Sequence, residues 1–221
     1  MSHFGVVFDL DGLLVDSERV QAMAFNAVLA PYGIELSDDD FAMFVGYSTA
    51  QNFNDLAGRH SKLAPHVQEI LAAKDRAYAE LVETHMKPMP GAVELVRMLH
   101  ASQVSMAVAS SSYRVDVEAC LCLVGLSNLL PTLSPGDEVA RTKPAPDVYL
   151  RAVQLLGIPA ASCVALEDAE AGVRAAKTAG LKCIAVPNRY TLRHDFSAAD
   201  LVLESLEALT LPAILALLQT N

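Results

Sequence analysis

FGVVFDLDG at residues 4–12 decides the fold, because a short apolar run leads directly into two aspartates and a glycine. A run of this length that is rich in valine and phenylalanine predicts a buried strand. Asp9 and Asp11 share a face for as long as the strand geometry lasts, and Gly12 allows the chain to turn sharply. Open α/β sheets bind ligands at the carboxyl ends of their strands. The two carboxylates therefore mark a candidate site, since buried like charge needs a cation or a reaction to offset it.

Composition and charge narrow the class of protein. The 221 residues permit one large domain or two modest ones, and a content of 52% apolar and 19% charged residues is typical of a globular protein. A net charge of -10 argues against nucleic acid or an anionic membrane as the main partner. No apolar run is long enough to span a bilayer. The sequence does not determine the oligomeric state, and we expect a monomer.

The N-terminal residues and the cysteines favour a cytoplasmic protein. No leader pattern precedes the first strand. The cysteines lie in apolar contexts without metal-ligand spacing, which predicts buried free thiols in a reducing compartment. They are Cys120, Cys122, Cys163 and Cys183. On a predicted helix the first two, being two residues apart, would not face each other.

Hydrophobic periodicity divides the chain into a helical insertion and an α/β region. Residues 16–87 show helical patterns and no convincing strand, with Ser37 and Asp40 forming a helix start of the capping-box type. From the Pro88–Gly91 boundary onward, strand and helix patterns alternate, which predicts a parallel sheet with helices on both faces. We therefore expect a doubly wound, Rossmann-like α/β core made of residues 1–15 and 88–221, and an all-helical cap made of residues 16–87.

The individual elements of the α/β region follow from the same patterns. The predicted strands after the first lie at residues 104–109, 163–166, 182–186 and 201–203. The predicted helices lie at 91–102, 113–124, 147–156 and 169–179, followed by a closing helix.

Polar side chains follow three of the predicted strands or precede a helix. Ser110 follows the strand at 104–109, Glu167 and Asp168 follow the strand at 163–166, and Lys143 precedes a helix. Together with the two aspartates of the first strand, these groups suit phosphoryl transfer. A divalent cation and a lysine offset the repulsion between a carboxylate and a phosphate, and a hydroxyl group holds the phosphate oxygens. All-oxygen ligands beside a phosphate favour Mg²⁺.

These motifs, in their order and spacing, resemble the four motifs of the haloacid dehalogenase-like superfamily, and its phosphatase and β-phosphoglucomutase branch most closely. The motifs are DLDGLLVDSE at residues 9–18, Ser110, Lys143-Pro144 and Glu167-Asp168. The resemblance covers essentially the whole chain, including a helical cap inserted after the first motif. It implies a phosphohydrolase that acts on small phosphorylated metabolites such as sugar phosphates, through an aspartyl-phosphate intermediate.

The resemblance also implies a role for each matching residue. Asp9 corresponds to the nucleophile and Asp11 to the general acid and base, while Ser110 and Lys143 bind and stabilise the phosphate. Ser111 and Ser112 follow Ser110 and are ambiguous from sequence; Ser111 is included among the substrate-binding candidates.

The resemblance further implies a Mg²⁺ site. Asp168, Asp9 and the main-chain carbonyl of Asp11 are the expected ligands, and Glu167 supports the site directly or from an outer shell.

Substrate specificity is expected to lie in the cap. Gln21, Thr49 and Lys74 are the candidate substrate-binding residues there, and Gly46 and Tyr47 lie in the same region. In β-phosphoglucomutase a histidine and an arginine stand where this chain has Gln21 and Thr49, which favours a hydrolase over a mutase. The mutase remains an alternative, as do a metal-free dehalogenase and an inactive phosphometabolite-binding protein.

Overall fold

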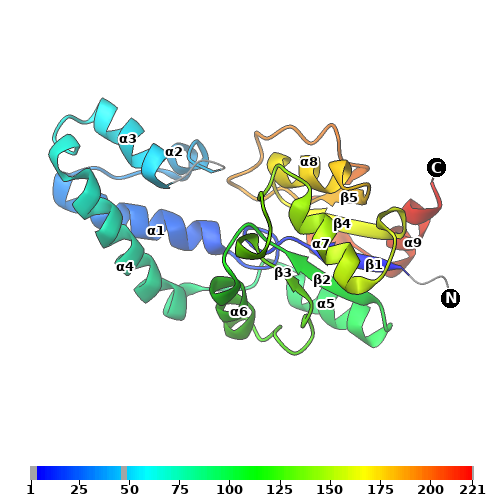
Figure 1. Ribbon diagram of the computed structural model, residues 1–221. Helices are drawn as coiled ribbons and strands as arrows, with labels where there is room; N and C mark the ends of the chain where they lie inside the picture. Colours follow the sequence, from blue (N-terminus) through cyan, green and yellow to red (C-terminus); the bar gives the residue numbers. More distant parts are fainter. Residues whose placement is uncertain (1–3, 46–48, 221) are drawn as a thin grey trace. The chain divides into compact units, whose positions relative to one another are not determined.

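The first strand lies in the interior of a six-stranded parallel sheet, in the computed structural model, which describes residues 4–45 and 49–220. The strand order is β3-β2-β1-β4-β5-β6, the order of a doubly wound, Rossmann-like sheet (Figure 1). The strands are β1 (Gly5–Phe8), β2 (Ser105–Ala109), β3 (Leu133–Ser134), β4 (Cys163–Glu167), β5 (Lys182–Ala185) and β6 (Leu201–Val202). The predicted fold class is thereby confirmed.

The chain divides into two compact units. The core unit comprises residues Met1–Asp16 and Lys87–Asn221, and the cap unit comprises Ser17–Met86. The helices of the core unit are α5 (Ala92–Ala101), α6 (Arg114–Leu123), α7 (Asp147–Leu156), α8 (Glu170–Thr178) and α9 (Leu211–Gln219). The helices of the cap unit are α1 (Ser17–Leu29), α2 (Asp38–Ala42), α3 (Thr49–Arg59) and α4 (Val67–His85).

Alternation along the strands explains why both faces of the sheet are covered. Val7 and Ala165 point to one face, where they join a buried cluster that includes Tyr149 of α7 and Val173 of α8. The residues that alternate with them, such as Phe8, are equally buried on the opposite face. Runs of apolar residues buried on both faces are typical of parallel sheets. Each large side chain buried in this way contributes roughly 1.5–3 kcal/mol of stability.

Strand register sets the position of the candidate site. Phe8 pairs with Val108 of β2 and with Leu166 of β4, so the carboxyl ends of these three strands are level. The next residue, Asp9, donates its backbone N–H to the carbonyl of Leu166 at 3.0 Å. The polar residues that follow each strand therefore meet at one edge of the sheet.

Among the described residues of the cap unit, 17–45 and 49–86, the regular elements are all helices, and turns connect them. The predicted capping box is confirmed: the Ser37 hydroxyl accepts the N–H of Asp40, and the Asp40 carboxylate accepts the N–H of Ser37. Phe25 is central to its core, because its ring stacks on Phe53 with centroids 4.7 Å apart and contacts the rings of Phe41 and Phe44.

The structure differs from the sequence expectations in two places. Strand β3 was not predicted, because two residues at the edge of a sheet give no readable alternation. Cys122 is exposed, whereas the other three cysteines are buried as expected. It lies on α6 two residues after Cys120, and such residues point to different sides of a helix.

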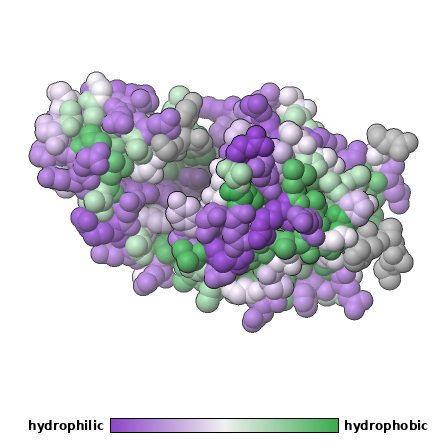
Figure 2. Space-filling view, viewed as in Figure 1, coloured by the Kyte–Doolittle hydropathy of each residue, from purple (hydrophilic) through white to green (hydrophobic). Residues whose placement is uncertain are grey.

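The visible surface is mostly hydrophilic, with smaller hydrophobic areas between polar ones (Figure 2). Among the described residues, no helix combines the length and the apolar character needed to cross a membrane.

Candidate active site

The loop after β1 turns tightly and presents both aspartates at the sheet edge. Gly12 has a φ of +79°, a left-handed conformation that favours glycine, and its N–H donates to the carbonyl of Val15 at 2.9 Å. Leu10 and Leu14 are fully buried and anchor the loop from within the core unit. Asp9 and Asp11 are thus held on a short, well-bonded turn.

Lys143 lies between two buried carboxylates. Its ammonium contacts Oδ1 of Asp9 and lies 2.7 Å from Oε1 of Glu167. The Tyr149 hydroxyl donates to the same Glu167 oxygen, and the Lys143 ammonium lies 5.2 Å from the centroid of the Tyr149 ring. Glu167 is 1% exposed, so this network is closed to solvent on that side. The network joins β1, β4, α7 and the segment that precedes α7.

Burial and neighbouring charge act in opposite directions on these groups. Burial raises the pKa of Asp9 to about 8, with the charge of Lys143 opposing the shift and the charges of Glu167 and Asp11 adding to it. Burial also disfavours the charged form of Lys143, but the Asp9 and Glu167 carboxylates outweigh it and raise the pKa of Lys143. The lysine therefore stays cationic, and one positive charge faces more than one negative group.

Three buried acids lie close enough to hold one metal ion. Asp9, Glu167 and Asp168 can each place a carboxylate oxygen within 4.8 Å of the others. Lys143 neutralises only part of this negative charge. Burying the remaining carboxylate charge is energetically unfavourable unless a further cation is bound. Carboxylate oxygens are the ligands of hard divalent cations. The donor set therefore fits a divalent metal such as Mg²⁺.

Asp11 faces a different set of partners. Its Oδ2 accepts a hydrogen bond from the Ser112 hydroxyl at 2.7 Å and lies 3.5 Å from the Ser110 hydroxyl. The Ser110 hydroxyl also accepts the N–H of Ser112 at 3.0 Å. Ser111, which lies between them in the chain, is exposed. The serine stretch after β2 thus positions Asp11 through its first and third members.

Two of the predicted cap residues line one cavity of the cap unit. Gln21 and Thr49 share a cavity of about 130 Å³ with Glu18, Phe25 and Asn52, among others. Polar side chains and aromatic rings thus line the same cavity.

Lys74 is also a cap residue and is only 4% exposed. Its ammonium lies over the rings of Phe25 and Tyr78, and burial lowers its pKa. Gly46 and Tyr47 lie outside the described residues.

Sequence reasoning missed three residues of the site. Tyr149 reads as a core residue on a helix, and nothing in the sequence links it to Glu167. The sequence does not distinguish Ser112, which bonds to Asp11, from the neighbouring Ser111. Asn188 follows β5, and its side-chain amide donates to Asp168 at 2.8 Å. The rule that identified the other candidates, a polar residue just beyond a central strand, would have found Asn188 as well.

Known proteins are similar to this chain over most of its length. A family model described as haloacid dehalogenase-like hydrolase matches residues 6–186. Protein CbbY of Rhodobacter capsulatus is 34% identical over 95% of this chain and 96% of its own length. The fructose-1-phosphate phosphatase YqaB of Escherichia coli is 31% identical over 82% of this chain and 95% of its own length.

A solved structure gives the same result. The crystal structure of a mutant of CbbY from Rhodobacter sphaeroides in complex with xylulose-(1,5)bisphosphate superposes with a TM-score of 0.74. It is 28% identical and covers 94% of this chain and 96% of its own. With the fold and the acidic cluster described above, these similarities show that the chain belongs to the haloacid dehalogenase-like hydrolases, in their phosphatase branch.

Proposed function

We propose that this protein is a Mg²⁺-dependent phosphohydrolase that acts on small sugar phosphates through an aspartyl-phosphate intermediate. The observation that carries the proposal is the convergence of Asp9, Lys143 and the Glu167-Asp168 pair at the carboxyl ends of β1 and β4. The sugar-phosphate substrate is supported by a relative named fructose-1-phosphate phosphatase and by the solved structure of a CbbY mutant in complex with xylulose-(1,5)bisphosphate.

Asp9 is the proposed nucleophile. A carboxylate oxygen of Asp9 attacks the phosphorus atom, the phosphorus–oxygen bond to the sugar breaks, and the phosphoryl group becomes bonded to Asp9. Lys143, held against Asp9 and Glu167, offsets the negative charge on the phosphoryl oxygens. Bound through Asp9, Asp168 and the main-chain carbonyl of Asp11, with Glu167 in support, Mg²⁺ would supply electrostatic stabilisation of the same oxygens.

Asp11 is the proposed proton carrier. It protonates the departing sugar oxygen, and in the second half of the reaction it accepts a proton from the water that hydrolyses the aspartyl phosphate. The hydrogen bond from Ser112 holds the Asp11 carboxylate in one orientation. Ser110, one residue beyond β2, is proposed to bind the phosphate through its hydroxyl. Ser111 is proposed as a backbone or side-chain contact to the same group.

Water, rather than a second sugar, is proposed to receive the phosphoryl group. Gln21 and Thr49 line the cap cavity at the positions where β-phosphoglucomutase has a histidine and an arginine. Glutamine does not exchange protons near neutral pH, and threonine cannot bind a second phosphate in a bidentate manner. We therefore assign the cavity, together with the nearby Lys74, to recognition of a neutral sugar group.

The test is a screen of sugar monophosphates and bisphosphates with Mg²⁺, in which both inorganic phosphate and isomerised sugar phosphate are measured. Release of phosphate with little isomer is the expected result. Asp9→Asn should lose turnover by several orders of magnitude and keep its fold, because the amide is nearly isosteric and a poor nucleophile. Rapid isomerisation without phosphate release would establish the mutase instead, and wild-type activity in Asp9→Asn would refute the covalent mechanism.

A further inference from the structure

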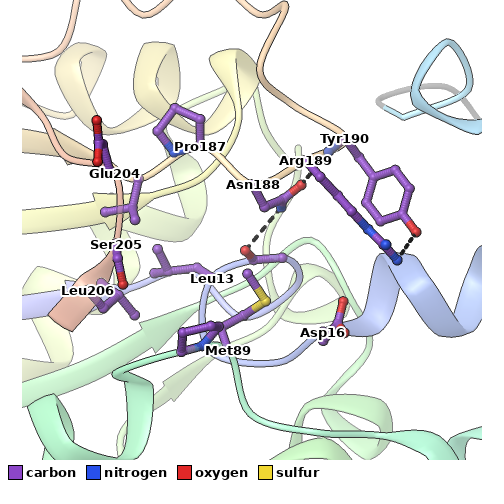
Figure 3. Close-up of a pocket in the computed structure, with 13 residues that line it drawn as sticks. Leu13, Asp16, Met89, Pro187, Asn188, Arg189, Tyr190, Glu204, Ser205 and Leu206 are labelled. Carbon is purple, nitrogen blue, oxygen red and sulfur yellow. Dashed lines mark hydrogen bonds between the residues drawn. The ribbon is translucent and has the colours of Figure 1, made fainter. Parts of the chain in front are cut away.

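Asn188 connects the loop after β5 to two parts of the candidate active site. Its side-chain Nδ2 donates to Oδ2 of Asp168 at 2.8 Å. The same Nδ2 donates to the main-chain carbonyl of Gly12 at 3.1 Å, a bond that Figure 3 draws as a dashed line from Asn188. Asp168 follows β4, and Gly12 belongs to the turn after β1. A single amide group therefore bridges the two segments that carry the acidic residues.

The orientation of this amide is fixed by its own loop. The Asn188 Oδ1 accepts the N–H of Tyr190 at 2.9 Å, and the Asn188 N–H donates to the Thr191 hydroxyl at 3.0 Å. Thr191 is fully buried. Because Oδ1 accepts a backbone N–H, the hydrogens of Nδ2 point to the Gly12 carbonyl and the Asp168 carboxylate. If the amide were flipped, its oxygen would face these two acceptors and its NH2 group would face the N–H donor.

Gly12 is packed closely against the same pair. A Cβ atom at this position would lie 2.7 Å from Nδ2 of Asn188 and would overlap the carboxylate of Asp168. The turn, Asn188 and Asp168 are thus in close contact at this point, and a side chain at position 12 would displace one of them.

We propose that Asn188 is a positioning residue that fixes the Asp168 carboxylate and the turn after Asp11 in the geometry that binds the divalent metal. The inference rests on the proposed function. Carboxylates that bind metals are themselves held by hydrogen bonds, and losing such a partner typically reduces metal affinity or activity by about 10–100-fold. By holding the Gly12 carbonyl, Asn188 also restrains the main chain of Asp11, the preceding residue and a proposed ligand.

A neighbouring cavity decides which substitution is the sharper test. Asn188, Gly12, Leu13 and Asp16 line a cavity of about 340 Å³ in the core unit (Figure 3). In Asn188→Ala, a water molecule from this space can take over part of the lost hydrogen bonding. Asn188→Leu keeps a side chain branched at Cγ, is somewhat larger than asparagine, keeps water out and removes the donor. We therefore expect Asn188→Leu to have an effect at least as large as that of Asn188→Ala.

The experiment measures Mg²⁺ binding directly by isothermal titration calorimetry on protein freed of metal, and the Mg²⁺ concentration for half-maximal hydrolysis in the same preparations. Both variants should bind Mg²⁺ roughly 10–100-fold more weakly than the wild type. The KM for the sugar phosphate at saturating Mg²⁺ should change less than threefold. Asn128→Ala, which truncates an exposed asparagine of the core unit, is the matched control and should behave as the wild type.

The outcomes separate a positioning role from a merely structural one. A structural role would lower the melting temperature in chelator and leave the Mg²⁺ dissociation constant of the folded protein unchanged, and that result would overturn the inference. If Asn188→Leu does not fold, Asn188→Ala decides the question on the same criterion. If the wild type binds Mg²⁺ and hydrolyses the substrate, and the Asn188 variants bind Mg²⁺ equally well, the inference about Asn188 is refuted and the proposed function stands. A wild type that neither binds Mg²⁺ nor hydrolyses any sugar phosphate refutes the proposed function, and the inference with it.

Discussion

Replacing Gly172 with alanine should weaken both the fold and the site, although alanine is the better helix former. Gly172 is the third residue of α8, and Glu167 lies beneath it. A Cβ atom there would lie closer than 3.0 Å to all three terminal atoms of the Glu167 carboxyl group. Glu167 cannot swing away freely, because it is 1% exposed and engaged by Lys143 and Tyr149.

The magnitudes favour destabilisation. Alanine in place of glycine stabilises a helix by at most about 1 kcal/mol. Forcing an extra methyl group into a packed interior costs about 1–3 kcal/mol. Displacing Glu167 from a charged hydrogen bond costs about 1.5–3 kcal/mol more. We therefore expect the free energy of unfolding of the core unit to fall by about 1.5–5 kcal/mol. For a unit of this size that corresponds to a melting temperature lower by roughly 3–20 °C.

The assay is differential scanning calorimetry in chelator, with turnover measured in parallel at saturating Mg²⁺. The matched control is Gly58→Ala in α3, where a Cβ atom would meet nothing within 4 Å. That variant should stabilise the cap unit slightly, by at most about 1 kcal/mol. Gly172→Ala should in addition lose turnover, because Lys143 contacts both Glu167 and Asp9, and moving Glu167 would shift the lysine away from Asp9. A core unit that melts at or above the wild-type temperature in Gly172→Ala would refute the packing argument.

Three further predictions concern the metal, pH and the cap. Asp168→Ala, which removes a proposed metal ligand, should need at least roughly 10–100-fold more Mg²⁺ for half-maximal activity, the loss that removal of an outer-shell partner causes. Excess chelator should abolish turnover in the wild type, and full activity in chelator would contradict a metal-dependent mechanism. In metal-free protein, burial raises the pKa of Asp9 to about 8 from 3.8, so the folded state retains a proton that the unfolded state has lost. The free energy of unfolding should therefore fall as pH rises from about 4 to 8, by up to about 1.4 kcal/mol per pH unit, and Asp9→Asn should lack this slope in urea titrations. Lys74→Met should stabilise the cap unit by about 1 kcal/mol, since an apolar group of similar length replaces a buried ammonium. The same variant should raise the KM for the sugar phosphate. An unchanged KM would show that Lys74 does not contact the substrate.

The sequence by itself determined the fold class and the membership of the family. Alternating strand and helix patterns predicted the parallel sheet, and the patterns at residues 163–166 and 182–186 correspond closely to β4 and β5. These features can be predicted from sequence because buried parallel strands are continuous apolar runs, and because turns and caps depend on local residue types. Ser37 and Asp40 show the same point, since a capping box is complete within four residues.

Only the tertiary structure decided which side chains meet. Lys143 and Asp9 are 134 residues apart in the chain, and Asn188 and Gly12 are 176 apart. Such contacts depend on strand order and register, which no local pattern encodes. The same reason explains why Ser112 rather than Ser111 bonds to Asp11, since that choice is set by the direction of the chain after β2. Local periodicity predicts that Tyr149 is a core residue, but it does not predict that its hydroxyl donates to Glu167. The partner of a buried polar group is determined by packing between distant segments.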